Sequence, residues 1–263
     1  MDALQYRRVV VKVGTSTLAY PTGLINIRQV ERLVKVLADL KNAGCQVLLV
    51  SSGAIGVGAG KLGLKSRPKD IPTKQAAAAV GQCELMYLYD KLFGEYNHSV
   101  SQLLLTRDVV EHPARKQNVT NTIETLLTLG VIPIINENDT VAIEEIEFGD
   151  NDTLSAIVAE VAGAELLVLL SDINGLYDRD PRKDPNARLI HTVTAITPEL
   201  EALAGGAGTE NGTGGMITKL HAGAIAEKAG FDMAIVNGEK AELLYPLCEG
   251  KPEGTFFRFR KPC

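Results

Sequence analysis

Residues 8–52 read RVVVKVGTSTLAYPTGLINIRQVERLVKVLADLKNAGCQVLLVSS. The stretch begins and ends with apolar runs, at residues 8–13 and 46–50, which are typical of strands buried on both faces. Between them, residues 27–42 carry apolar side chains at helical spacing, and Gly44 follows where such a helix should end. The order strand, helix, strand predicts a βαβ unit whose two strands are parallel.

The same alternation continues along the rest of the chain. Further strands are predicted at residues 102–105, 131–135, 166–170 and 233–236, and further helices at residues 74–93, 115–129, 153–162 and 216–229. Glycines again stand where helices should stop before a strand, namely Gly130, Gly163 and Gly230. We therefore expect an α/β fold with three layers, an α/β/α sandwich around a mainly parallel central sheet.

One short segment departs from this alternation. Residues 141–143 and 146–148, separated by Glu144-Glu145, predict a hairpin outside the main sheet. No low-complexity linker or internal repeat divides the 263 residues, and α/β folds commonly reach this size undivided. We expect a single domain over residues 1–263, built from two lobes of one sheet, the first over about 1–160 and the second over about 161–263.

Composition excludes several classes of protein. The chain is 45% apolar with a net charge of −5, so it has no overall positive field to attract nucleic acid. No apolar run approaches the roughly 20 residues that cross a bilayer, and the N-terminus lacks the layout of a signal peptide. Cysteines and histidines lack metal-ligand spacing. We expect a cytoplasmic protein with no membrane contact, no nucleic-acid partner and no metal bound by side chains.

Unusual polar residues gather where the predicted strands end. They are Lys12 at the first strand, Ser52 and Gly53 after the second, Asn136 and Asp139 after the fourth, Ser171 and Asp172 after the fifth, and Asp150, Asn151 and Asp152 at the start of the helix predicted near residue 153. Ligands of open α/β sheets bind at the carboxyl ends of the strands. The five clusters therefore predict a ligand site at this edge.

Three of these clusters also have a plainer interpretation. Lys12 could extend its ammonium to solvent from a packed stem, or it could aim a cation into the crevice. Ser52-Gly53 could be a turn with a helix cap, or it could offer backbone N–H groups to an anion. The residues at 150–152 could cap a helix, although capping explains only one of them well. Asp139 and Asp150 could instead pair with an ammonium group of a substrate.

Residues 205–219 read GGAGTENGTGGMITK and lead into a predicted helix. Such a run can bring backbone N–H groups to a phosphate, with Lys219 adding a full charge, or it can be a flexible loop. It is not a P-loop, because no glycine directly precedes Lys219. A second run, GAGKLG at residues 58–63, fits G-x-G-x-x-G but lies several residues past its strand. That displacement argues against a dinucleotide site.

Eight segments follow one another over nearly the whole chain: VVVKVGTSTL, VLLVSSGAIGVG, KQAAAAVGQ, LLLTRDV, VIPIINENDTVA, FGDNDTLSA, LLSDINGLYDRDPR and GTGGMITKLHAGAIAEKAG. Together they resemble the amino acid kinase family, most closely its branch that phosphorylates the γ-carboxylate of L-glutamate. The resemblance implies ATP at the carboxyl edge of the sheet, with Mg²⁺ carried on its phosphates, and glutamate beside it. Many members continue into a small RNA-binding-like module. This chain stops at Cys263, so we expect the short form.

The resemblance also implies a role for each site residue. Lys12 and Lys219 would flank the transferring phosphoryl group, and Asp152 would orient both ammonium groups. The first lobe would bind glutamate, through Ser52, Gly53, Asn136, Asp139, Asp150 and Asn151. The second would bind ATP, together with Lys12, through Ser171, Asp172, Thr213, Gly214, Gly215, Met216, Ile217, Thr218 and Lys219.

The chemistry of phosphoryl transfer to glutamate agrees with a site that has no evident general base. A glutamate carboxylate, with a pKa of about 4.3, is already ionised at neutral pH and needs no general base. Two alternatives stay open: another acceptor of the same family (acetylglutamate, carbamate, aspartate or UMP), or a non-catalytic sensor on the same fold. The resemblance further implies that the protein forms a homo-oligomer and catalyses the first step of proline biosynthesis. It also implies inhibition by proline and transfer of the product to a γ-glutamyl phosphate reductase.

Overall fold

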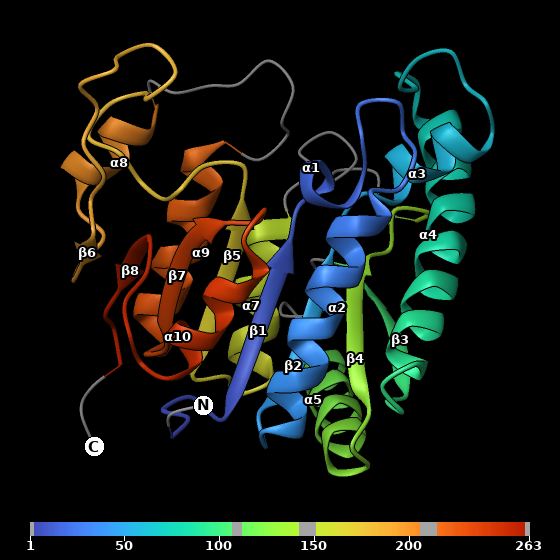
Figure 1. The fold of residues 1–263 in the computed structure, drawn as a ribbon, viewed down its shortest axis with the longest axis horizontal. Helices are drawn as coiled ribbons and strands as arrows, with labels where there is room; N and C mark the ends of the chain where they lie inside the picture. The colour runs from blue at the N-terminus through green and yellow to red at the C-terminus, as the bar shows by residue number, and fades with distance from the viewer. Residues whose placement is uncertain (1–2, 107–111, 142–150, 206–214, 261–263) are drawn as a thin grey trace.

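The computed structural model describes residues 3–106, 112–141, 151–205 and 215–260, and its centre is an eight-stranded sheet (Figure 1). The strands are β1 (Arg8–Val13), β2 (Gln46–Ser51), β3 (Val100–Leu105), β4 (Ile132–Glu137), β5 (Leu166–Ser171), β6 (Thr192–Val193), β7 (Asp232–Asn237) and β8 (Thr255–Phe257). Their spatial order is β3-β4-β2-β1-β5-β7-β8-β6. Each neighbouring pair is parallel except β7 and β8, which are antiparallel.

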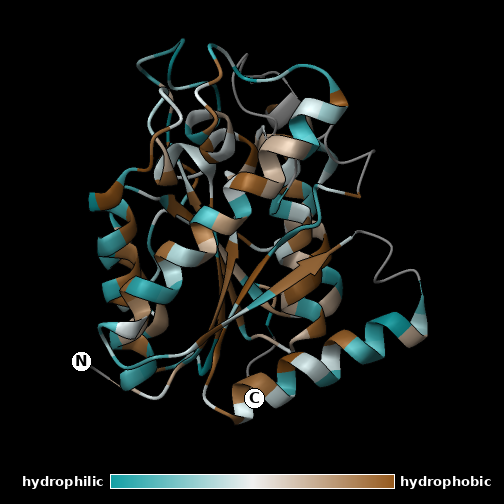
Figure 2. Ribbon diagram, turned by 90° about the vertical axis from the view of Figure 1, so that its right-hand side faces the viewer, coloured by the Kyte–Doolittle hydropathy of each residue, from teal (hydrophilic) through white to brown (hydrophobic). Residues whose placement is uncertain are grey.

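Helices cover both faces of this sheet. They are α1 (Thr15–Leu18), α2 (Ile27–Asn42), α3 (Ala54–Lys61), α4 (Ile71–Gly94), α5 (Pro113–Thr128), α7 (Asn151–Val161), α8 (Pro198–Gly205), α9 (Met216–Ala229), η2 (Ala241–Leu243) and α10 (Leu244–Cys248). Side chains of α2, α4 and α10 share one apolar core with one face of the sheet, and those of α5, α7 and α9 share a second core with the other face. Figure 2 shows the apolar strands enclosed between these helices. The predicted three-layer α/β/α sandwich is confirmed.

Alternation along β1 decides which face each of its residues serves. Val9, Val11 and Val13 lie in the core with α2 and α4, whereas Val10 lies in the core with α7 and α9. Because successive side chains of a strand point to opposite faces, Lys12 shares the face of Val10. The lysine therefore leaves the sheet on the side of α7 and α9.

The predicted helix ends are confirmed. Gly44, Gly130, Gly163 and Gly230 all have positive φ, which glycine adopts without steric cost. The helix predicted to start near residue 153 begins two residues earlier, because Asn151 and Asp152 form its first turn. The predicted hairpin at 141–148 lies outside the described residues from residue 142 onward, as does the glycine-rich run over 206–214.

The second glycine run has a packing role, which fits the exclusion of a dinucleotide site. Residues 58–61 belong to α3, which crosses α4 closely. A Cβ on Gly58 would overlap the carbonyl oxygen of Ala77, and a Cβ on Gly81 would overlap that of Ala54. The two helices can approach this closely only because both positions lack a side chain.

Within the described ranges, no helix combines the length and the apolar character needed to cross a membrane.

Candidate active site

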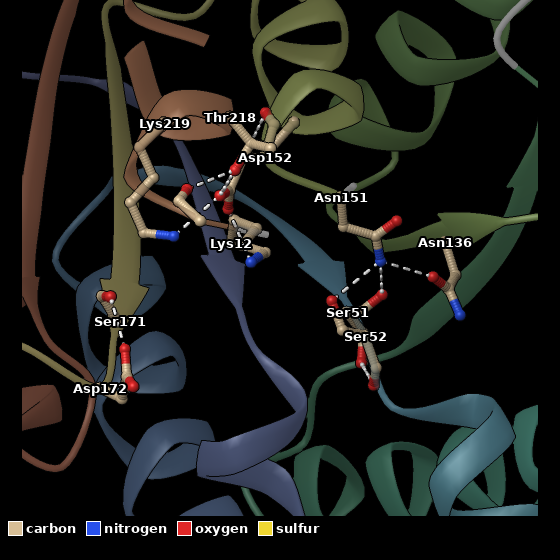
Figure 3. A network of polar contacts seen from close by, with 12 residues as sticks. Lys12, Ser51, Ser52, Asn136, Asn151, Asp152, Ser171, Asp172, Thr218 and Lys219 are labelled. Carbon is tan, nitrogen blue, oxygen red and sulfur yellow. Dashed lines mark hydrogen bonds and ion pairs between the residues drawn. The ribbon is translucent and has the colours of Figure 1, made fainter. Parts of the chain in front are cut away.

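Asp152 lies between two lysines at the carboxyl edge of the sheet (Figure 3). Its Oδ1 is 2.7 Å from Nζ of Lys12, which comes from β1, and its Oδ2 is 2.9 Å from Nζ of Lys219, which comes from the first turn of α9. These residues are more than 60 positions apart in the sequence. They meet because Lys12 lies on the face of the sheet that α7 and α9 cover. The structure thus joins the three residues for which catalytic roles were predicted.

Burial makes this arrangement electrostatically strong. Asp152 is 1% exposed and Lys219 is 7% exposed. Desolvation by itself raises the pKa of the Asp152 carboxyl, but the charges and hydrogen bonds of Lys12 and Lys219 outweigh it and hold that pKa well below its ordinary value. The carboxylate is therefore charged at neutral pH. With two ammonium groups on one carboxylate, the cluster carries a net positive charge.

The start of α9 adds a third contact to Asp152. The hydroxyl of Thr218 lies 2.9 Å from Oδ2 of Asp152 and 2.8 Å from the carbonyl oxygen of Gly215. Since the hydroxyl carries one hydrogen, it donates to one of these oxygens at a time. Thr218 thereby ties the first turn of α9 to the first turn of α7, and Lys219 is fixed in position by the same contact.

Amide and hydroxyl groups form a second cluster next to Asp152. Nδ2 of Asn151 lies within 2.9 Å of three acceptors, the carbonyl oxygen of Ser51, Oγ of Ser52 and Oδ1 of Asn136, and its two hydrogens are shared among them. Asn136 is buried, and its Nδ2 donates to Oε1 of Gln82, 2.9 Å away. Four of these five residues come from the ends of β2 and β4 and from the start of α7. Gln82, on α4, was missed by sequence reasoning.

Two further predicted residues of the glutamate subsite, Gly53 and Asp139, lie at the same edge. Gly53 precedes α3 with φ of 96°, a left-handed conformation that favours glycine. Asp139 is half-buried on the turn that follows β4. Asp150 lies outside the described residues.

A pocket opens on the side of Lys219 that faces away from the amide and hydroxyl cluster. Five of the predicted nucleotide-binding residues line it: Ser171, Asp172, Gly215, Met216 and Lys219. Ile217 and Thr218 lie in the first turn of α9 but do not line it, and Thr213 and Gly214 lie outside the described residues. The pocket is completed by residues that sequence reasoning did not assign: Ile173, Leu176, Tyr177, Arg179, Asp180, Pro181, Arg182 and Leu203. All but Leu203 fall in the segment LLSDINGLYDRDPR, one of the segments that resemble the family, and that segment was the sequence feature from which they could have been predicted.

Polar contacts tie this segment to the strand end. Oγ of Ser171 donates to Oδ1 of Asp172 at 3.2 Å, and the guanidinium of Arg182 contacts Oδ2 of Asp172 at 2.7 Å. The last pair is exposed, so it orients Asp172 more than it stabilises the fold. Among the described residues, no group of three or more histidine, cysteine or acidic side chains is placed to hold a metal ion.

Solved structures share this fold. The carbamate kinase from Giardia lamblia bound to AMP-PNP superposes with a TM-score of 0.63 over 98% of this chain and 99% of that chain, at 16% identity. The isopentenyl phosphate kinase of T. acidophilum, in its product complex, gives 0.62 over 95% and 100%, at 17% identity. At such identities the likeness shows the fold alone.

Sequence relatives are much closer. The model of the amino acid kinase family matches residues 7–237. A glutamate 5-kinase of Clostridium perfringens is 53% identical over 259 residues, which cover 97% of this chain and 96% of the relative. A glutamate 5-kinase of Listeria innocua is 53% identical over 97% and 94%, and one of Clostridium acetobutylicum is 55% identical over 95% and 94%. The chain therefore belongs to the amino acid kinase family, and within it to the glutamate 5-kinases.

Proposed function

We propose that this protein transfers the γ-phosphoryl group of ATP to the γ-carboxylate of L-glutamate, forming γ-glutamyl 5-phosphate in the first step of proline biosynthesis. One observation carries the proposal: the buried carboxylate of Asp152 holds the ammonium groups of Lys12, which is half-buried, and Lys219, which is buried, between the pocket and the amide cluster. Lys219 lines the pocket, and Asn151, next to Asp152 in the chain, begins the cluster. A phosphoryl donor in the pocket and a phosphoryl acceptor at the amide cluster would meet at the two lysines.

The physical need for this arrangement comes from the charges of the two substrates. A triphosphate and a carboxylate repel each other, by about 4 kcal/mol for each pair of unit charges at 4 Å and an effective dielectric near 20. Lys12 and Lys219 oppose that repulsion with positive charge that is fixed before the substrates arrive. No base is needed, because the acceptor carboxylate is ionised at neutral pH. The residues thus act by positioning and by charge.

The pocket residues fit a nucleotide. Lys219 and the N-terminus of α9 offer positive charge to phosphates, while Leu176, Tyr177 and Met216 offer apolar surface to a base or sugar. We propose that Mg²⁺ comes with ATP, held mainly by phosphate oxygens and water, and that it supplies further charge neutralisation there. In this division the first lobe, about residues 1–160, binds glutamate, and the second, about residues 161–263, binds ATP.

The amide cluster and Asp139 fit an amino acid. Oδ1 of Asn151 and the Asp139 carboxylate are acceptors for an ammonium group, which N-acetylglutamate and UMP lack. Ser52 and the backbone N–H groups that begin α3 are donors for a carboxylate. We propose that Asp150 joins Asp139 against the substrate ammonium.

We further propose the setting in which the enzyme works. An acyl phosphate is labile, so a γ-glutamyl phosphate reductase is the partner that would consume it. Resemblance to the family supports a cytoplasmic homo-oligomer that is inhibited by proline competing near the glutamate subsite.

Trapping with hydroxylamine tests the proposed reaction. Purified protein with Mg-ATP, L-glutamate and hydroxylamine should give γ-glutamyl hydroxamate, and omission of any one component should abolish it. Acetylglutamate, aspartate, carbamate and UMP, tested by ADP release, should be poorer acceptors. Absence of hydroxamate, or faster turnover of another acceptor, would contradict the proposal.

A further inference from the structure

Gln82 is buried on α4 and faces the end of β4, outside the groups to which a direct role has been given. Its Oε1 accepts the hydrogen bond from Nδ2 of Asn136. Oδ1 of Asn136 in turn accepts from Nδ2 of Asn151 and from the backbone N–H of Glu137. Three side-chain amides therefore form one chain that runs from α4 across β4 to the first turn of α7.

Backbone groups fix the direction of every amide in this chain. The N–H of Glu137 can only donate, so the Asn136 atom that faces it, 2.9 Å away, is the oxygen. The carbonyl oxygen of Ser51 can only accept, so the Asn151 atom that faces it is the nitrogen. Nδ2 of Asn136 therefore faces Gln82, and the atom of Gln82 that accepts its hydrogen bond is Oε1. If any of the three amides were turned over, two nitrogens or two oxygens would face each other, and a hydrogen bond would be lost.

This direction decides what Asn151 offers to a ligand. The two N–H bonds of Asn151 are shared among three protein oxygens, namely Ser51 O, Ser52 Oγ and Asn136 Oδ1. Its Oδ1 points the other way, as Figure 3 shows, and has no donor among the described residues. Asn151 is half-buried, so this oxygen is accessible to a small molecule. An amide oxygen held in this way selects a hydrogen-bond donor and rejects an acceptor.

We propose that Gln82 is a positioning residue of the glutamate subsite. Its Oε1 fixes the amide of Asn136, which holds the amide of Asn151 with Oδ1 directed at the ammonium group of the substrate. The assignment rests on the proposed function, since it presumes that glutamate binds beside Asn151. Loss of the acceptor on Gln82 leaves a buried N–H of Asn136 without its partner, and the chain of amides loses its anchor on α4.

The variant Gln82→Met tests this assignment, because methionine keeps the length of the side chain and removes the acceptor. We expect the KM for glutamate to rise by about 5–30-fold, the equilibrium factor for a loss of one or two kcal/mol. The KM for ATP and kcat should change less than about twofold, because the ammonium groups of Lys12 and Lys219 are held by the carboxylate of Asp152 and not by the amides of the chain. Glutamate binding measured by calorimetry in the absence of ATP should weaken by the same factor as KM.

Two further variants separate positioning from a general loss of structure. Gln82→Glu keeps an oxygen in the place of Oε1 and should keep the glutamate KM within about threefold of the wild type, on the same hydrogen-bond accounting. Gln102→Met makes the same substitution at an exposed position on β3 and should alter neither KM.

The outcomes distinguish failure of this inference from failure of the proposed function. Wild-type protein that forms no hydroxamate would refute the function and this inference with it. An active wild type together with an unchanged glutamate KM in Gln82→Met would refute the positioning role alone. So would equal increases in both KM values, or a Gln82→Glu variant as impaired as Gln82→Met.

Discussion

Replacing Asp152 by asparagine keeps the shape of the side chain and removes the buried charge that Lys12 and Lys219 share. At contact distances of 2.7 and 2.9 Å, each ion pair is worth about 6 kcal/mol at an effective dielectric near 20. The cost of burying the charges offsets much of this attraction. Removal of one partner from a buried pair therefore costs about 3–5 kcal/mol in net stability. Such a loss is a large part of the total stability of a domain, about 5–15 kcal/mol.

We expect ligand-free Asp152→Asn to unfold in urea with a free energy about 3–5 kcal/mol below that of the wild type at pH 7. Asp172→Asn is the matched control for stability, since the same change breaks only an exposed pair with Arg182 and should cost less than about 1 kcal/mol. If Asp152→Asn unfolded within about 0.5 kcal/mol of the wild type, the two ion pairs would contribute no stability and the reasoning would be wrong.

The pH dependence of the same difference gives a second check. The pKa of Asp152 is lower in the folded protein than its ordinary value of 3.8. A group with a lowered folded pKa stabilises the fold above its unfolded pKa, and this contribution is lost as the pH falls toward the folded value. The difference between wild type and Asp152→Asn should therefore be constant above about pH 5 and should shrink below about pH 4. A difference that grew as the pH fell would have the wrong sign.

Other perturbations have equally definite outcomes. Lys219→Ala should lower kcat by about 100–1,000-fold, as expected for loss of a fixed charge at the transferring group, while glutamate binding survives; unchanged turnover would refute the role. Gly81→Ala should destabilise the protein by about 1–3 kcal/mol in thermal unfolding, because its Cβ would overlap the neighbouring helix, whereas Gly94→Ala, in open space, should be neutral. Ser52→Ala should raise the glutamate KM about fivefold or more by removing an acceptor of the amide cluster, with ATP unaffected; an unchanged glutamate KM would count against that subsite.

Strong periodic patterns made the central sheet predictable from sequence. The predicted segments 8–13, 27–42 and 216–229 coincide with β1, α2 and α9. Helix α3 was missed because AIGVGAGK contains three glycines, and glycine is a poor helix former. Packing against α4 stabilises it, which no local pattern reveals. The short strands β6 and β8 carry too few residues for a period-2 signal.

Clusters at strand ends made much of the candidate site predictable as well. Lys12 stood out because a charged residue is rare in an apolar run, Asp152 because helix capping explained only one of residues 150–152 well, and Lys219 because it ends a glycine-rich run before a helix. Gln82 could not be found in this way, because it lies inside a helix, away from the strand ends in sequence, and acquires its role only through contact with β4. The pocket residues between Ile173 and Arg182 lie in an irregular segment, and only tertiary structure shows that they face Lys219.

Transfer of a labelled oxygen tests the central claim most directly. L-Glutamate carrying ¹⁸O in its γ-carboxylate is incubated with Mg-ATP and the enzyme, and hydroxylamine then releases phosphate from the acyl phosphate by attack at carbon. If the two lysines bring ATP and the carboxylate together, a single ¹⁸O from glutamate will appear in the phosphate. Phosphate without label would show that the γ-phosphoryl group went to water or to another acceptor, and would contradict the account.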